Sequence, residues 1–203
     1  MVELNLIGQS LALKDVAFLE VVRLESLRVA LLVVFLAGLS HALGQSIVLF
    51  ANEVKPRRFV ASLILGALIY LSGFLFFSFS IWLVEGFIFG KEESFKNMVK
   101  VVGLAYSPYL FNFFILTPYF GSFFSVALSL WSLAAILVGL RAVLALSFWQ
   151  AFVCSALGWV LLQLVNRTLG RPVHSLTRAG RRLVAGTKLE QSPKNLSKHQ
   201  GRS

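Results

Sequence analysis

His41 and Gln45 are polar side chains close to the middle of a long apolar segment, and one helical turn separates them. A charged side chain at the centre of a bilayer costs at least about 2.5–3.5 kcal/mol, so an ionisable group at that depth is a functional candidate by default. One interpretation is a proton relay or ligand site built on the imidazole. The other is a neutral histidine that hydrogen-bonds to a neighbouring helix, where such bonds average about 0.6 kcal/mol. The residues favour the second interpretation, and the first stays open.

A second polar element, Tyr106-Ser107-Pro108, interrupts another apolar segment, and Asn112 follows it one turn later. Pro108 has no amide hydrogen to donate, so it removes one backbone hydrogen bond and predicts a kink. The carbonyls that it frees would line a polar pocket together with the hydroxyls of Tyr106 and Ser107. In transporters, broken helices mark binding sites as corresponding pairs in two halves of the fold. No second half is visible here, which favours a kink that helps the helices to pack.

Charged residues at the ends of apolar segments are further candidates. Glu85 ends the second segment and would reach the membrane interface. Arg141 would extend to headgroups, interact with the C-terminal end of a helix dipole, or pair with Glu85. A basic stretch near the C-terminus carries four arginines that would contact anionic lipid headgroups: Arg171, Arg178, Arg181 and Arg182. A solvated, positively charged anchor without binding specificity explains the same stretch, and a charge run of this kind favours that interpretation.

No established catalytic or metal-binding motif is present. The sequence lacks the phosphate-binding G-x-x-x-x-G-K-[ST] loop, the H-E-x-x-H zinc motif and the G-x-S-x-G nucleophile elbow. The three histidines are scattered, and the lone Cys154 excludes an intramolecular disulfide and a cysteine-only metal site. The basic tail has no accompanying nucleic-acid-binding platform. We therefore expect no enzymatic activity, no cofactor, no metal and no nucleic-acid partner.

The composition indicates that membrane-spanning helices carry these residues. Hydrophobic residues make up 57% of the chain and charged residues only 14%, whereas a soluble domain has about 25% charged residues. Four long stretches contain no Asp, Glu, Lys or Arg: 29–52, 59–84, 101–140 and 142–166. The surface of such a chain belongs in lipid, where helices satisfy their own backbone groups.

The lengths of these stretches predict the number of spans. About 20 helical residues cross a hydrocarbon core, so three stretches fit one span each. The stretch 101–140 has room for two spans on either side of a turn at Pro118 and Gly121. The predicted fold is an all-α, polytopic membrane helix bundle with five transmembrane helices, at about 29–50, 59–84, 98–117, 122–140 and 145–165.

The two ends of the chain lie outside this bundle of residues 29–166. Residues 1–28 are expected to form a short N-terminal helix that is interfacial or packed on protein, without a clean amphipathic face. Residues 167–203 are expected to form a basic tail, with an interfacial helix and then a disordered segment. Five spans place the termini on opposite sides, and basic residues divide twelve to seven in favour of the tail side, or eight to seven near the membrane. The positive-inside rule therefore places the tail in the cytoplasm.

Small residues recur at four-residue spacing in several predicted spans, as in Gly38/Ala42 and Ser125/Ser129. Such stripes let helix backbones approach closely. They would serve packing within the bundle, self-association or contact with another membrane protein, and spacing alone does not separate these uses. Packing within the bundle is the default interpretation.

Several of these segments resemble the Yip family of five-helix membrane proteins. The likeness lies in Tyr106-Ser107-Pro108, the turn at Pro118 and Gly121, Trp131 ahead of residues 139–143, and residues 144–147 followed by Gln150-Ala151. It covers roughly residues 29–166 and is closer to the short prokaryotic members than to the eukaryotic ones. The resemblance implies a compact five-helix bundle without known catalysis, acting in membrane organisation or as a scaffold.

The resemblance to eukaryotic members is limited at the N-terminus. Those relatives carry a long cytosolic N-terminal region associated with Rab contacts, whereas only about 28 residues precede the first predicted span here. Rab binding is therefore not carried over. The cytosolic N-terminus of those relatives is also opposite to the orientation that the charge count predicts.

The leading functional hypothesis is a non-enzymatic scaffold or accessory protein in membrane organisation or membrane-complex assembly. The alternative is a small channel or transporter with a polar site around His41, Gln45, Tyr106 and Pro108. A third hypothesis is recruitment of anionic lipids by the basic tail. The expected partners are membrane lipids, together with other membrane proteins or a second copy of this chain.

Overall fold

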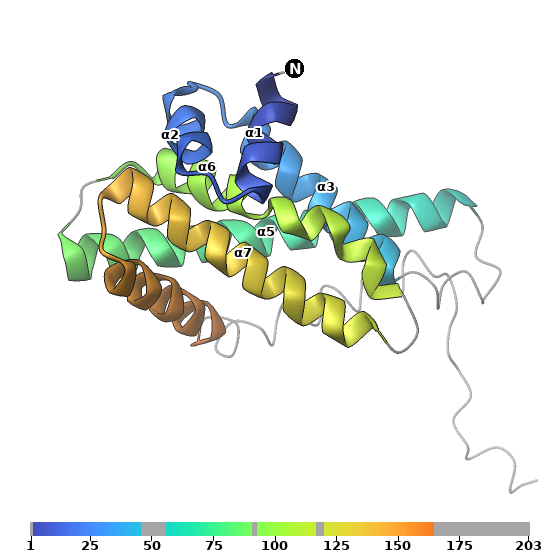
Figure 1. Cartoon of the computed structure of the whole chain (residues 1–203). Coiled ribbons are helices and arrows are strands. Elements are labelled where there is room, and N and C mark those ends of the chain that lie inside the picture. The colour runs from blue at the N-terminus through green and yellow to red at the C-terminus, as the bar shows by residue number, and fades with distance from the viewer. Residues whose placement is uncertain (1, 46–55, 91–92, 117–119, 165–203) are drawn as a thin grey trace, which may run out of the picture.

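The computed structural model describes residues 2–45, 56–90, 93–116 and 120–164, and every regular element in these ranges is a helix (Figure 1). The elements in chain order are α1 (Val2–Leu11), α2 (Asp15–Arg23), α3 (Arg28–Gln45), α5 (Pro56–Phe89), α6 (Phe95–Ala105), the 3₁₀ helix η1 (Ser107–Leu116) and α7 (Gly121–Leu144). A further apolar helix, Phe148–Leu164, follows α7. The predicted all-α membrane helix bundle is confirmed.

Two helices are long and apolar enough to cross a membrane unaided, namely Phe59–Phe89 within α5 and Gly121–Leu144, which is α7. Two bent pairs raise the number to as many as four: α2 with α3, and α6 with η1. The Phe148–Leu164 helix is also apolar but shorter. The chain is therefore an integral membrane protein, and the exact count of five spans stays a prediction.

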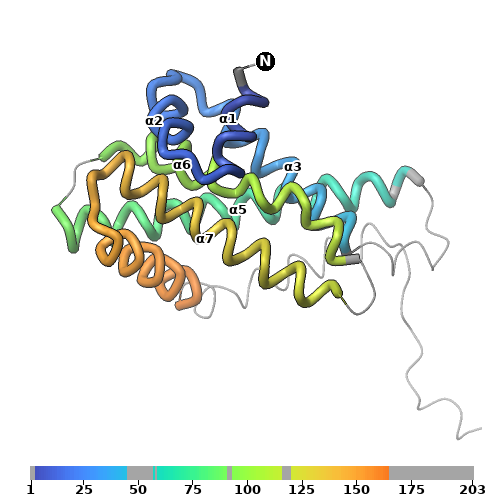
Figure 2. Tube along the Cα trace, in the orientation of Figure 1, coloured from blue at the N-terminus to red at the C-terminus, as the bar shows by residue number. Residues whose placement is uncertain are grey.

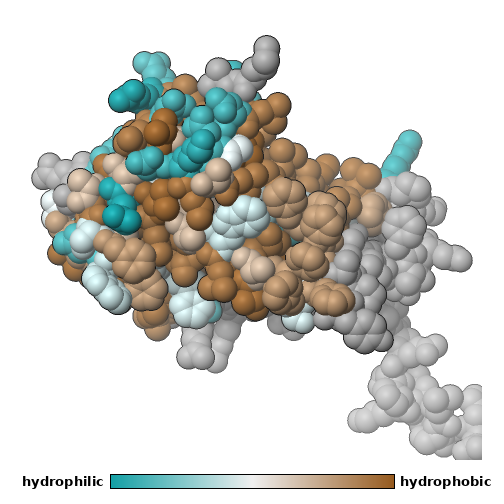
Figure 3. All heavy atoms as spheres, viewed as in Figure 1, coloured by the Kyte–Doolittle hydropathy of each residue, from teal (hydrophilic) through white to brown (hydrophobic). Residues whose placement is uncertain are grey.

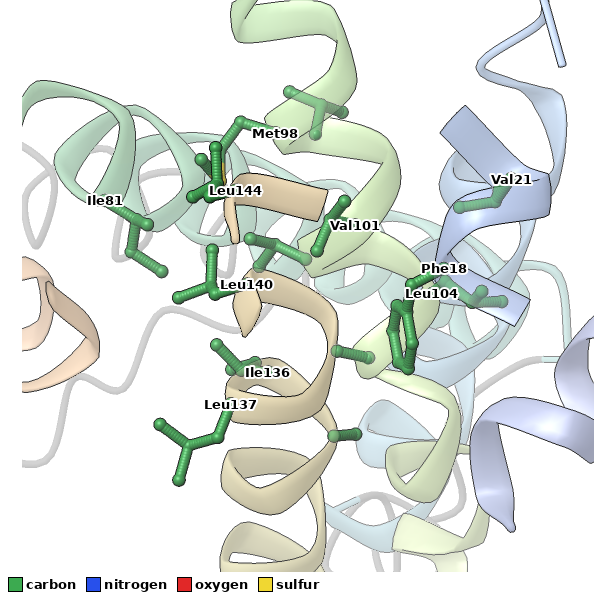
Figure 4. Packing of buried hydrophobic residues seen from close by; sticks show 14 of the residues in the cluster. Phe18, Val21, Ile81, Met98, Val101, Leu104, Ile136, Leu137, Leu140 and Leu144 are labelled. Atoms are coloured by element: carbon green, nitrogen blue, oxygen red, sulfur yellow. The ribbon is translucent and has the colours of Figure 1, made fainter. Parts of the chain in front are cut away.

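The α6 helix occupies the centre of the bundle. It packs against α1, α2, α3, α5 and α7, and all residues from Met98 to Ala105 are buried. Around it, α3 packs against α5 and η1, and α7 packs against η1. Figure 4 shows Val101 and Leu104 of α6 among Phe18, Leu140 and Leu144, which come from α2 and α7.

Close helix approach depends on small residues. A Cβ added to Gly103 would lie 2.7 Å from the Cβ of Ala30, so α6 and α3 touch nearly backbone to backbone. A Cβ on Gly38 would likewise lie 3.0 Å from the Cα of Ala67 in α5. The small residues of α3 thus serve packing within the bundle, as the default interpretation had it. Ser129 of α7, in contrast, is exposed.

The N-terminal region contains two helices where the sequence predicts one. Leu13 adopts a left-handed backbone conformation, with φ of 56°, between α1 and α2. The chain then turns by 119° between α2 and α3. The buried residues of α2 are Ala17, Phe18 and Val21. This narrow apolar face holds the helix on the bundle, although residues 1–28 have no clean amphipathic face. Figure 2 traces this hairpin over α6 before the chain enters α3.

The outer surface divides into an apolar and a polar part. Figure 3 shows hydrophobic residues over most of the visible bundle and hydrophilic residues gathered over α1 and α2. Large side chains such as Phe123 and Leu130 of α7 are more than half exposed, at 67% and 62%. A surface of this kind is stable only against lipid or another apolar partner.

Candidate functional site

Buried polar groups gather at two places in the described part of the bundle, and the first of these polar centres lies at Pro108. This proline follows the last turn of α6, and α6 and η1 meet there at an angle of 42°, so the predicted kink is present. Because Pro108 has no amide hydrogen, the Leu104 carbonyl four residues earlier loses its helical donor. The hydroxyl of Ser107 donates to that carbonyl at 2.6 Å, and the hydroxyl of Ser10 in α1 donates to it at 3.0 Å.

Two more hydroxyls complete the backbone hydrogen bonds around the break. Ser132 of α7 donates to the Ala105 carbonyl at 2.9 Å. Ser40 of α3 donates to the Leu110 carbonyl at 2.8 Å and accepts a hydrogen bond from the Phe113 amide at 2.9 Å. Serines from three surrounding helices thus replace the lost helical bonds, which ties α1, α3 and α7 to the centre of the bundle.

A group of aromatic and polar side chains lies next to the break. Tyr70 of α5 is at its centre, with ring centroids 5.5 Å from His41, 6.0 Å from Tyr106 and 6.5 Å from Tyr109. The Tyr106 and Tyr109 rings are 5.1 Å apart. A side-chain hydrogen bond joins Tyr70 to Asn112, which is buried. We call these five residues the tyrosine cluster.

The tyrosine cluster unites three of the predicted site residues, His41, Tyr106 and Asn112. Sequence reasoning missed Tyr70, because it lies in an otherwise apolar span about thirty residues away from His41. The cluster offers phenol hydroxyls, an imidazole and an amide, which donate and accept hydrogen bonds without a formal charge when the imidazole is neutral. Such a set suits neutral polar groups or helix-to-helix hydrogen bonding better than a bare ion.

Lys100 forms a second polar centre, which the sequence analysis did not single out. Its side chain is buried within α6, and its ammonium donates to the carbonyl oxygens of Val22 at 2.9 Å and Leu24 at 2.5 Å. It also donates to Asn97 Oδ1 at 3.2 Å. The two carbonyls lie at the C-terminal end of α2, where helical acceptors lack donors and a cation is favourable. The feature of the sequence that could have indicated this centre is a lysine within an apolar helical face.

A hydrogen-bonded chain extends this centre to the end of α5. Asn97 donates to Glu93 Oε1 at 2.6 Å, and the Glu93 amide donates to Glu85 Oε1 at 3.3 Å. The Trp82 indole donates to the Glu93 carbonyl at 2.9 Å. Glu85, predicted to reach the interface, is fully buried against protein in this network. The network joins α2, α5 and α6 at one end of the bundle.

The remaining candidates stay apart from both centres. Arg141 is exposed in the last turn of α7, where a cation favours the helix dipole, and it makes no ion pair with a described residue. Gln45 lies at the end of α3, but its side chain falls outside the described part of the chain. Pro118 and the four tail arginines, Arg171, Arg178, Arg181 and Arg182, also lie outside it. Within the described ranges, no group of three or more His, Cys, Asp or Glu could hold a metal ion.

Comparison with known proteins gives one finding. A protein-family model described as the Yip1 domain matches residues 14–165. The matched range begins just before α2 and ends just after the Phe148–Leu164 helix, so it contains the tyrosine cluster and the Lys100 network. No curated protein and no solved structure matches the chain.

Proposed function

Because the chain belongs to the Yip family, we propose that it is a non-enzymatic integral membrane protein that acts as a scaffold or accessory protein. Its role would lie in membrane organisation or in the assembly of membrane complexes. Its partners would be membrane lipids together with another membrane protein or a second copy of the chain.

The observation that carries the proposal is the use of the polar groups at the Pro108 break. The hydroxyls of Ser10, Ser40, Ser107 and Ser132 are all bound to backbone groups of the break. These side chains fix the relative positions of helices instead of facing a substrate. A rigid bundle with a wide apolar exterior is what a protein that organises its membrane neighbours requires.

The proposal is tested by purifying the tagged chain at natural abundance in a mild detergent or in native nanodiscs. Mass spectrometry of the complex should find a membrane protein or a second copy in stoichiometric amount. The purified chain should also leave ion and small-solute gradients across liposomes intact. Unaided movement of a solute by the pure protein would contradict a scaffold role.

The tyrosine cluster favours a second candidate function, a small channel or transporter. The contacts of His41, Tyr106 and Asn112 with Tyr70, between α3, α5 and η1, support this candidate. If this function is right, His41→Ala and Tyr106→Phe should reduce flux in liposomes. The matched control is Ser129→Ala, because Ser129 is exposed on α7 and bonds only to its own helix. If the unmodified protein moved no solute across the liposome membrane, the channel or transporter function would be excluded.

A further inference from the structure

The α1–α2 hairpin (residues 2–23) is attached to the bundle as a separate layer. It packs against α6, α7 and η1, whereas the packing of α3 against α5 and of α7 against η1 does not pass through it. Residues 24–27 and the 119° turn connect it to α3. In Figure 3 the hydrophilic residues of the visible face gather mainly over this hairpin, with hydrophobic residues among them. The hairpin therefore has an inner apolar face and a single covalent link to the spans that are described. Its outer face mixes charged residues such as Lys14 and Asp15 with exposed apolar ones such as Leu4 and Val16.

The apolar contact of the hairpin centres on Phe18. This side chain and Val21 are fully buried, and Figure 4 shows Phe18 beside Leu104 of α6. A Cβ added to Gly139 would lie 2.8 Å from Phe18 Cδ1, so the ring rests directly on the α7 backbone. The hairpin thus covers an apolar surface formed by α6 and α7.

Polar contacts fasten the hairpin at two places. At the end of α1, next to the turn into α2, Ser10 donates to the Leu104 carbonyl, and the Trp131 indole donates to the Leu11 carbonyl at 3.0 Å. At the α2 end, the Lys100 ammonium holds the carbonyls of the final turn, immediately before the chain turns into α3. Lys100 acts on three elements at once, because Asn97 links its amine to the loop after α5.

We propose that the α1–α2 hairpin is a lid that opens as a unit from the α6–α7 face, and that Lys100 is the latch that keeps it closed. Removing the ammonium leaves the carbonyls of Val22 and Leu24 without their donor at the point where the hairpin leaves the bundle. A buried acceptor without a donor favours the state in which water reaches it, which is the open state. The bundle contacts among α3, α5, η1 and α7 stay in place, so opening uncovers the apolar surface beneath Phe18 without unfolding the spans. This inference goes beyond the proposed scaffold role and does not depend on it.

The test uses two cysteine reporters in full-length protein reconstituted in nanodiscs. Val21→Cys in a Cys154→Ala background reports on the inner face of the lid. The native Cys154 reports on the bundle, because it is fully buried and its sulfur lies 3.7 Å from the Ile81 carbonyl of α5. Each reporter is combined with Lys100→Met or with Lys96→Met, the exposed lysine one turn earlier in α6. The measured quantity is the rate of modification by a water-soluble maleimide.

Lys100→Met should increase the modification rate at position 21 about tenfold, which corresponds to about 1.4 kcal/mol, and leave Cys154 protected. Lys96→Met should change neither rate. An unchanged rate at position 21 in Lys100→Met would overturn the latch. Faster modification of both reporters would overturn it too, because Lys100 would then stabilise the whole bundle. If Lys96→Met increased the modification rate at position 21 as much as Lys100→Met does, the change would come from lost surface charge, and the latch would be overturned.

Discussion

The close approach of α3 and α6 gives the most direct test of the packing. Gly103→Ala adds a Cβ that meets the Ala30 Cβ at 2.7 Å and the Ala30 Cα at 3.1 Å. Neither atom belongs to a flexible side chain, so the two helices must move apart. Overpacking of this kind costs about 1–3 kcal/mol, and the better helix propensity of alanine returns about 1 kcal/mol. The expected result is a free energy of unfolding lower by up to about 2 kcal/mol.

Gly73→Ala is the matched control, because Gly73 lies in α5 with no atom near the position of an added Cβ. It gains helix propensity without a steric cost, so its stability should rise by up to about 1 kcal/mol. Both variants are compared with the parent by denaturation in mixed micelles, followed by circular dichroism. The double variant Ala30→Gly with Gly103→Ala removes the closest contact and should show a favourable coupling of about 0.5 kcal/mol or more. If Gly103→Ala were as stable as Gly73→Ala, the backbone-to-backbone approach would be refuted.

Three further predictions concern the break, the tail and the orientation. Ser132→Ala removes the donor to the Ala105 carbonyl and should lower the free energy of unfolding by about 0.6–1.7 kcal/mol in a denaturation in mixed micelles. In the same titration, the control Ser129→Ala should change the free energy of unfolding by no more than about 0.5 kcal/mol. Deletion of residues 171–203 should leave the circular dichroism of the bundle intact and weaken the association of the micelle-solubilised protein with anionic lipid; equal association would end the lipid-recruitment hypothesis. Lys188→Cys in a Cys154→Ala background should react with an impermeant maleimide only after the cytoplasmic side is exposed, and labelling of intact cells would reverse the predicted orientation.

The fold class and the kink were predictable because their signals are local. Uncharged stretches long enough to span a bilayer indicate helices in lipid whatever surrounds them. Pro108 lacks an amide hydrogen in any context, so a bend near it follows from the residue alone.

The contacts that define both polar centres were not predictable, because they join residues far apart in the chain. Lys100 donates to a carbonyl 78 positions away, and Ser10 donates to one 94 positions away. Without the fold, Lys100 counts only as a positive charge near a membrane surface. Tyr70 is likewise one aromatic residue among many until α5 places it beside His41. The sequence supplies candidate donors, and only tertiary packing selects their acceptors.

The length of α5 creates a hydrophobic mismatch with the bilayer. Its apolar part, Phe59–Phe89, contains 31 residues, or about 46 Å of helix, against a hydrocarbon core of about 30 Å. Even a tilt of about 40°, the upper end of the usual range, leaves about 35 Å along the membrane normal. Residues 59–84 carry no charge and fill the hydrocarbon core. The length of helix that exceeds the core therefore lies at the end of α5 that carries Trp82 and Glu85. A thicker bilayer would draw that end toward hydrocarbon and a thinner one would release it to the headgroups, so membrane thickness acts on the polar network at the end of α5.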